Sequence, residues 1–469
     1  MKTCLTESTK ISRRSFLQAL GALTLSSSLA ACGGTGKAKS DRLAAGSLAY
    51  TPDEVVTVEF SDGGITVSPE DAAGLAVEET ALSVSGAGVY ALSGNCADGS
   101  VKVEAQTEDV VLLLDGLTLT SADTAPIVCG ESTGVTIAVV DGTENTLTDS
   151  EANDPDNAAD NENAEKAVVK CKDGSQVVLC GGGALTVNAL GKNGIKSGTA
   201  LDDRDASLTI RELTLNIEAL VNDAINAEQR LKVESGNLTI AAGEDAIHCD
   251  MELNIGAEGT TGPAITVSTC CEGLEGAVLN IYSGNMDITS TDDCLNAANS
   301  DLGDYAFEIN ISGGTIKAYS SEGDGFDSNG TLTITGGDIS VWTANAADNQ
   351  PLDADGRITI SGGTVLAAGG SAGMGFSISA SQPYVIFGGG RDSSLSLAGG
   401  AAFSIADESG KSVLDSTALC DAAFLLLLQP SPDGMTPPDG APSDGQMPQG
   451  QPPQSDGTTP PELPAASSN

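Results

Sequence analysis

Five-residue segments that start with an acidic or amide residue recur seven times between residues 193 and 354, and we call them the pentads. They begin at Asn193, Asp223, Asp245, Glu272, Asp293, Asp324 and Gln350, at spacings of 30, 22, 27, 21, 31 and 26 residues. If the pentads stack as parallel strands, equivalent residues lie about 4.8 Å apart. Two carboxylates at that spacing repel by about 3–4 kcal/mol near a protein surface. Such a column of acids needs either exposure to water or a bound cation.

Calcium is the cation that suits this column, because it takes about six to eight oxygen ligands from carboxylates, amides and backbone carbonyls. The sequence predicts a calcium cluster from two successive pentads, formed by Asp292, Asp293, Asp324 and Asp327. Asp223 and Asp245 are the second candidate pair. The alternative is that each Asp caps a turn by accepting a backbone N–H bond, which Asp does commonly.

The fourth pentad positions mix one base, one histidine and several acceptors, as a sugar-facing surface does. They are Lys196, Asn226, His248, Glu275, Asn296, Asp327 and Asp353. Asn226, His248 and Asn296 are candidate carbohydrate contacts, together with Trp342, the one Trp of the chain. His248 is the one His, which excludes a site built from a His pair. Lys196 is the weak candidate for a catalytic base, because it is the one basic residue in a pentad.

The elements that must position these residues are short strands. Runs of Val, Ile, Leu and Thr alternate with Asp-Gly and Gly-Gly turns, with almost no helical period. A second motif recurs between the pentads: a turn such as Ser235-Gly236 or Gly313-Gly314 followed by an alternating strand. A unit this small cannot bury its apolar face alone, so neighbouring units must stack. The pattern favours an all-β parallel solenoid over a sandwich.

Composition changes predict the boundaries of the chain's parts. Residues 51–190 are expected to form N-terminal coils with an acidic loop at 141–166, residues 191–378 the repeats, and residues 379–428 a C-terminal cap. The apolar stretch 422–428 is expected to close the end of the core. The Pro-rich segment 429–469 has a composition that predicts disorder.

The first 32 residues have the pattern of an export signal. Arg13 and Arg14 form a twin-arginine motif before the mostly apolar run 19–29, and the string 29–33 (Leu-Ala-Ala-Cys-Gly) matches a bacterial lipobox. We therefore expect lipidation at Cys32, a tether at 33–50, and a protein exported and anchored by lipid to the outer face of the cell membrane. Nine cysteines follow Cys32. Core filling and disulfide staples are both open readings for them.

The charge excludes one class of partner. The chain carries 65 acidic and 21 basic side chains, a formal charge of −44, which repels polyanions. Nucleic-acid binding needs clustered Lys and Arg instead. Cations are the natural partners of this chain.

From about residue 55 to 370 the chain resembles a family of secreted bacterial carbohydrate-binding β-helix proteins related in shape to pectate lyases, one member of which binds polygalacturonate. The resemblance is carried by the strings 112–116 (Leu-Leu-Leu-Asp-Gly) and 141–147 (Asp-Gly-Thr-Glu-Asn-Thr-Leu) and by the repeated Asp-(Gly/Ala)-(Ile/Phe) corners. It implies a right-handed parallel β-helix, bound calcium and acidic plant polysaccharides as ligands. The chain departs from the pattern at Glu272 and Gln350.

The residues and the resemblance together favour calcium-dependent, non-catalytic binding of an acidic, pectin-like polysaccharide at the cell surface. Low aromatic content agrees with this, since neutral-sugar binders usually offer stacking platforms. A pectate-lyase-like enzyme is the first alternative, because calcium and a base of lowered pKa together remove the proton beside a uronate carboxylate. A structural or adhesive surface protein without glycan affinity is the second.

Overall fold

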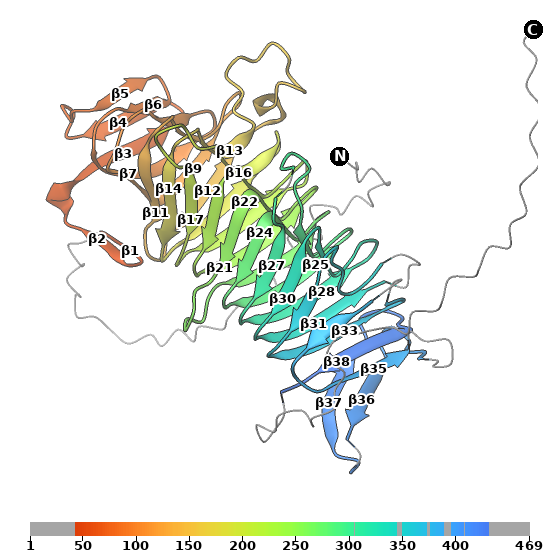
Figure 1. Ribbon diagram of the computed structural model, residues 1–469. Coiled ribbons are helices and arrows are strands. Elements are labelled where there is room, and N and C mark those ends of the chain that lie inside the picture. Colours follow the sequence, from red (N-terminus) through yellow and green to blue (C-terminus); the bar gives the residue numbers. More distant parts are fainter. Residues whose placement is uncertain are drawn as a thin grey trace, which may run out of the picture.

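The computed structural model describes residues 43–303, 305–344, 349–372, 376–388, 395–407 and 409–430. Within these ranges the protein is all-β. Thirty-four of its 38 strands join one large, mostly parallel sheet, and the two helical elements are single 3₁₀ turns, η1 (Pro52–Glu54) and η2 (Glu151–Asn153). Figure 1 shows the strands following one another along the molecule from the N-terminal to the C-terminal end. The prediction of an all-β chain with mostly parallel strands is confirmed.

Strands pair with their equivalents in the next repeat, and this produces three ladders. Ladder A contains β6 (Ala81–Val84), β8 (Ser100–Val103), β10 (Ile127–Cys129), β13 (Ala167–Cys171), β16 (Asn193–Ser197), β19 (Ile225–Ala227), the first parts of β22 (Ile247–Ile255) and β24 (Leu274–Ile281), β26 (Leu295–Ala297) and β29 (Phe326–Ser328). The pentads form its C-terminal half.

Ladder B follows ladder A in each repeat. It contains β3 (Val55–Ser61), β7 (Gly88–Cys96), the first part of β9 (Val110–Thr120), β11 (Gly134–Val139), β14 (Gln176–Gly181), β17 (Ser207–Ile210), β20 (Arg230–Val233), the second parts of β22 and β24, β27 (Glu308–Ile311), β30 (Thr331–Ile334), β32 (Ile358–Ile360) and β34 (Ile378–Ala380).

Ladder C completes each repeat. It contains the second part of β9, β12 (Glu144–Thr148), β15 (Ala184–Asn188), β18 (Thr214–Ala219), β21 (Asn237–Ala242), β23 (Ala264–Thr269), β25 (Asn285–Ser290), β28 (Thr315–Ser320), β31 (Asp338–Thr343) and β33 (Thr364–Gly369). The remaining strands are β1 (Leu43–Ala45), β2 (Leu48–Tyr50), β4 (Gly64–Ser68), β5 (Leu75–Glu78), β35 (Tyr384–Gly388), β36 (Ala402–Ala406), β37 (Ser412–Thr417) and β38 (Phe424–Leu428).

The pentads lie in register because their third position is apolar. Ile195, Ile225, Ile247, Leu274, Leu295, Phe326 and Leu352 are each paired with the next and at most 1% exposed. Side chains alternate between the two faces of a strand. With the third position buried, the fourth position must face outward, and a slip of one residue would bury the polar row.

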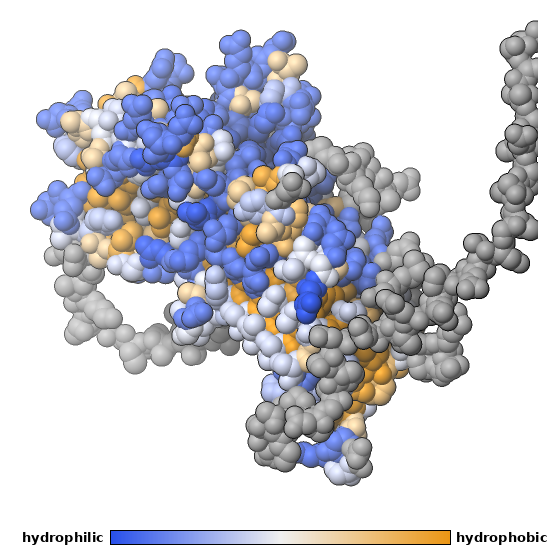
Figure 2. Space-filling model, viewed as in Figure 1, coloured by the Kyte–Doolittle hydropathy of each residue, from blue (hydrophilic) through white to orange (hydrophobic). Residues whose placement is uncertain are grey.

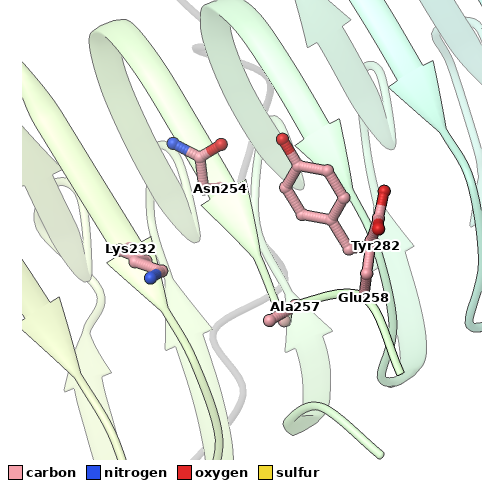
Figure 3. A pocket seen from close by; sticks show the side chains of 6 residues that line it. Lys232, Asn254, Ala257, Glu258 and Tyr282 are labelled. Carbon is pink, nitrogen blue, oxygen red and sulfur yellow. The ribbon is translucent and has the colours of Figure 1, made fainter. Parts of the chain in front are cut away.

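The corner between ladders B and C explains the Gly-Gly motif. Gly236, Gly284, Gly314, Gly337 and Gly363 end three-residue corners and all have positive φ, between 78° and 127°. Glycine adopts this conformation without a steric penalty. One corner differs: between β22 and β23 the connection is residues 256–263, and it projects beside the neighbouring strands (Figure 3).

Additional strands lie at both ends of the sheet, packed on its outer face at the N-terminal end and paired to its edge at the C-terminal end. The hairpin β1–β2 packs its apolar side chains against the outer faces of β7, β9, β11 and β14, and Ala45 is fully buried there. At the other end β38 pairs antiparallel with β33 and β35, and Phe424–Leu428 are buried. The stretch 422–428, which was expected to close the end of the core, contains β38, whose side chains are buried. Figure 2 shows hydrophilic residues over much of the N-terminal strands and more hydrophobic surface toward the C-terminal ones.

Three predicted boundaries change. The tether at 33–50 is wrong for residues 43–50, because Leu43, Leu48 and Tyr50 find an apolar surface to pack on. The acidic loop at 141–166 includes strand β12, so the loop proper is 149–166. Strand β34 continues ladder B across the expected boundary between 378 and 379. The signal, Cys32 and residues 431–469 of the tail lie outside the described residues.

Two other observations concern the described residues. The thiols of Cys249, Cys270 and Cys294 are buried, and no disulfide forms within the described part of the chain, as core filling requires. No helix there is long and apolar enough to cross a bilayer.

Candidate functional site

The outward row of ladder A carries the chemistry of the pentads. In register it runs through Lys170, Lys196, Asn226, His248, Glu275, Asn296 and Asp327, and the Phe326–Leu352 bridge adds Asp353. We call it the polar row. Basic residues stand at its N-terminal end, and carboxylates stand at its C-terminal end. Because one sheet holds every member, the row is a fixed line of charges.

The aspartates at the first pentad position cap the next repeat. Asp223 Oδ1 accepts a hydrogen bond from the backbone N–H of Asp245 at 3.1 Å. Asp293 Oδ1 accepts from the N–H of Asp324 at 2.6 Å, and Asp324 Oδ1 accepts from the N–H of Gln350 at 2.5 Å. The turn-capping alternative therefore accounts for one oxygen of each carboxylate. In Asp223 the second oxygen is also bonded, to the Asn226 amide at 2.7 Å.

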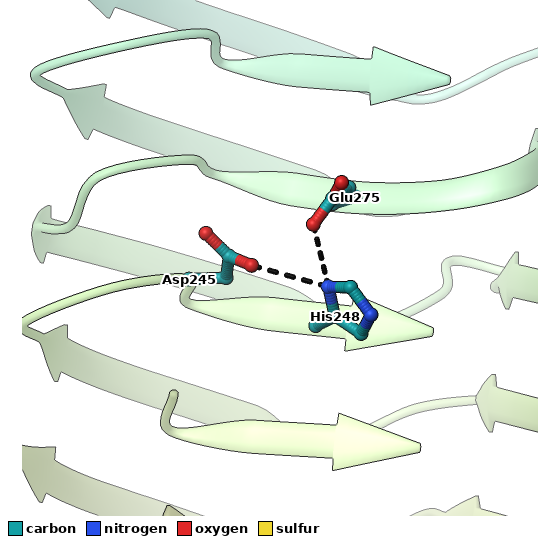
Figure 4. A group of neighbouring side chains, drawn as sticks. All are labelled: Asp245, His248 and Glu275. Carbon is teal, nitrogen blue, oxygen red and sulfur yellow. Dashed lines mark hydrogen bonds and ion pairs between the residues drawn. The ribbon is translucent and has the colours of Figure 1, made fainter. Parts of the chain in front are cut away.

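His248 lies among three carboxylates, two of which, Asp245 and Glu275, are drawn in Figure 4. Its Nδ1 is 2.5 Å from Glu275 Oε2 and 3.1 Å from Asp245 Oδ2, and its Nε2 is 2.7 Å from Asp250 Oδ1. Burial opposes the charged imidazolium, but these hydrogen bonds outweigh it and raise the pKa of His248 far above its usual range. His248 is therefore a built-in cation at this point of the row. It was expected to contact carbohydrate, but both ring nitrogens are already bonded within the protein.

Lys196 is a second built-in cation. Its Nζ lies 2.6 Å from Glu228 Oε1 and 2.7 Å from Asn226 Oδ1. Lys170, one repeat earlier, is a residue that the sequence reasoning missed. Burial and the neighbouring Lys196 charge lower its pKa. The signal was present in the alternation of strand 167–171, which places Lys170 in the same row as Lys196.

The C-terminal end of the row has carboxylates without a basic partner. One oxygen each of Asp324, Asp327 and Asp353 lies within 4.8 Å of the others, and none of the three forms an ion pair with a described Lys, Arg or His. We call these three residues the aspartate cluster. Burial, followed by repulsion from other aspartates, raises the pKa of Asp327 to about 6; burial also raises that of Asp324 to about 7, despite the bond from Gln350. The fold therefore brings these carboxyls together at a cost to their ionisation, and no basic side chain among the described residues offsets that cost.

The expected calcium set is only partly brought together. Asp324 and Asp327 join Asp353, which the sequence reasoning had not selected. Asp293 is 9% exposed and caps Asp324, and Asp292 contributes its charge nearby. Asp223 and Asp245 have different partners: Asp223 accepts a backbone N–H bond, whereas the Asp245 carboxylate faces His248.

Asn296 adds an unused acceptor to the row. It is 7% exposed and lies in register with Asp327. Its Nδ2 donates to Glu272 Oε2 at 2.8 Å, while its Oδ1 has no hydrogen-bond partner among the described residues. Buried amide oxygens are rarely left unpaired. The amide therefore has an acceptor available for a cation or a hydroxyl.

Trp342 does not contact the surface. Its side chain is 0% exposed, donates from Nε1 to Ser340 Oγ at 3.0 Å and packs edge-on against Phe403. Trp342 was expected to contact carbohydrate, but the C-terminal strands cover the outer face of β31 and leave its side chain no access to a sugar.

Comparison with known proteins places the chain in a family. A family model described as "Carbohydrate-binding domain-containing protein" matches residues 78–373. A protein of the same description from Acetivibrio thermocellus is 30% identical over 184 residues, which are 39% of this chain and 60% of that relative. The chain thus spans about 60% of the length of this relative.

A solved structure, described as the polysaccharide lyase-like protein from C. thermocellum in a gadolinium derivative, is 23% identical with a TM-score of 0.36. The match covers 66% of this chain and 98% of that one. By the family match over most of its described length, the chain belongs to the carbohydrate-binding domain-containing protein family.

Proposed function

We propose that the protein binds an acidic, pectin-like polysaccharide without cleaving it, and that calcium held at the aspartate cluster is required. The observation that carries the proposal is a difference along one row. His248 and Lys196 neutralise carboxylates from within the chain, whereas Asp324, Asp327 and Asp353 have no such partner among the described residues. A cation bound from solution would neutralise these three carboxylates, as His248 and Lys196 neutralise others.

The residues present fit calcium. Three carboxylate oxygens within 4.8 Å of one another can share one ion whose ligands lie at about 2.3–2.6 Å. Asp324, Asp327 and Asp353 would hold it, and Asn296 offers a further amide oxygen. The ion would supply positive charge to which a uronate carboxylate can bind. This explains how a chain of charge −44 holds a polyanion.

We further propose that the three ladders form a right-handed parallel β-helix. Pairing of each strand with its equivalent in the next repeat supports this arrangement. It presents the polar row as one straight line, which suits an extended polymer. With lipidation at Cys32 and export, that line would face the outside of the cell, where such polymers occur.

A lyase is the weaker candidate. Its one favourable observation is the lowered pKa of Lys170, which burial and Lys196 produce. A lyase needs its base and its calcium on the same sugar. Lys196 lies five repeats from Asp327 in the row, roughly 24 Å at about 4.8 Å per repeat. Lys196 is also bonded to Glu228 and Asn226.

The test is retention of the full chain on immobilised polygalacturonate, with calcium and then with chelator. We expect retention with calcium, loss with chelator, and loss in both conditions for Asp327→Asn combined with Asp353→Asn. Asp338→Asn is the matched control, because Asp338 is an exposed aspartate at the start of β31. Retention that survives the chelator unchanged contradicts the mechanism. Absence of binding to any glycan would favour the structural alternative.

A further inference from the structure

The long corner at residues 256–263 is built into the fold. The other corners from β17 to β33 between ladders B and C have three residues: 211–213, 234–236, 282–284, 312–314, 335–337 and 361–363. This one has eight, so five additional residues project from the sheet. A solenoid tolerates additional residues at a corner without disturbing the stack.

The next repeat holds this corner in place. The Ser283 hydroxyl, only 7% exposed as a residue, accepts from Ala257 N at 3.2 Å and donates to Ala257 O at 3.0 Å. Thr260 Oγ1 lies 3.0 Å from the same hydroxyl and donates to Ala257 O at 2.8 Å. Gly256 approaches so closely that a Cβ atom would lie 2.2 Å from Ser283 Oγ. The corner is therefore a fixed wall.

The wall forms one side of a cavity of about 400 Å³ that is open to solvent on the outer face of ladder B. It is lined by Lys232, Asn254, Gly256, Ala257, Glu258 and Tyr282. In Figure 3 the Tyr282 ring stands between Asn254 and Glu258. The volume is within the range of small-ligand sites, about 300–1,000 Å³.

The polar groups of the cavity are already oriented. Asn254 donates to Glu252 Oε1 at 3.0 Å and accepts from the Asn280 amide at 3.2 Å. Asn280 in turn accepts from Asn310 at 3.1 Å, so the amide is the end of a hydrogen-bonded line across three repeats. The Tyr282 hydroxyl has no partner among the described side chains, which leaves it available to a ligand.

The charge of the cavity selects an uncharged ligand. Lys232 Nζ is paired with Glu234 Oε1 at 2.7 Å, and Glu258 adds a second carboxylate at the rim. The local charge is therefore negative, which repels a uronate. Carboxylate, amide and phenol groups beside an aromatic face match the hydroxyls and the apolar C–H face of a pyranose.

We propose that this cavity binds an uncharged pyranose residue of a polysaccharide, independently of calcium. It is a second sugar site on a different ladder from the polar row. This inference rests on the proposed carbohydrate binding but not on the calcium mechanism. The neutral-sugar site and the calcium-dependent site can therefore be disproved separately.

The experiment measures binding of four neutral tetrasaccharides, cellotetraose, xylotetraose, mannotetraose and galactotetraose, to the full chain in chelator by calorimetry. We expect at least one to bind at millimolar concentration or better. Tyr282→Ala should weaken that binding by about tenfold or more, while Tyr282→Phe, which keeps the ring, should retain most of it. Tyr384→Ala, at a 52% exposed tyrosine of β35, is the matched control and should change nothing.

A second variant replaces residues 256–263 by Ser-Gly-Gly, the sequence of corner 312–314, and removes the wall while keeping a corner that the fold already uses. It should lose the neutral sugar but keep calcium-dependent retention on polygalacturonate. Failure of all four tetrasaccharides to bind, or unchanged binding by Tyr282→Ala and the corner variant, would overturn the proposal.

Discussion

Replacing His248 by Gln removes a built-in cation and leaves the side chain close to its original size. Asp245, Asp250 and Glu275 would then share a partly buried space without a positive partner. Removal of one member of a buried ion pair costs about 3–5 kcal/mol. The His248 side chain is 22% exposed, so water screens part of this cost, and we expect a loss of about 2–4 kcal/mol in the free energy of unfolding.

The dependence on pH has a defined sign. The folded-state pKa of His248 lies above its ordinary value, so its stabilising contribution is complete below about pH 6.5 and decreases as pH rises from there toward the folded pKa. Chemical denaturation of wild type and His248→Gln near pH 6.5 and near pH 9 measures this. The difference between the two proteins should be larger at the lower pH. Calcium should recover part of the lost stability in the variant, because three carboxylates there then need a cation.

The matched control is Lys317→Gln. Lys317 pairs with Asp287 at 3.2 Å, and both side chains are 52% exposed. An exposed pair of this kind contributes about 0–1 kcal/mol, so this variant should stay near wild type. If His248→Gln is as stable as wild type at both pH values, the imidazole is not a structural cation, and the reasoning about charge along the polar row fails.

Three further outcomes are expected. In chelator, Asp327→Asn should have a higher melting temperature than wild type near pH 8 but not near pH 4. Burial, followed by the Asp353 charge, raises the Asp327 pKa to about 6, so ionisation of Asp327 destabilises the wild-type fold as pH rises through that value. A lower melting temperature of the variant near pH 8 would contradict this. Trp342→Phe should leave polysaccharide retention unchanged and lower the melting temperature, because Trp342 is a core residue; lost retention in a well-folded variant would refute its buried role. Incubation with polygalacturonate and calcium should give no unsaturated product by ultraviolet absorbance, whereas product that depends on Lys170 or Lys196 would establish the lyase.

Much of the fold follows from repetition in the sequence. An apolar third position in every pentad fixes register, since only one register buries Ile225, Ile247 and Leu274 together. The outward direction of the fourth position follows from the same alternation. The repeats do not predict which other segments of the chain cover that outer surface. Trp342 does face outward from the core, but β38 and its neighbours, far along the chain, cover it.

The contacts between charged side chains were harder to predict from the sequence. Asp250 lies outside the pentads, so the pattern gave no sign that it would bind His248 Nε2. Asp353 belongs to a pentad that begins with Gln350 rather than an acid, although its own position is equivalent to that of Asp327. The wall at 256–263 could not be located from the sequence. The variable spacing of the pentads shows that some repeats contain additional residues, but it does not show at which corner they lie.

The most direct measurement is anomalous diffraction from crystals of the full chain grown with calcium. We expect a peak bonded to carboxylate oxygens of Asp324, Asp327 and Asp353, with none between His248 and Glu275. A peak between His248 and Glu275 with none at the three aspartates, or no peak along the polar row under saturating calcium, would contradict the proposed basis of binding.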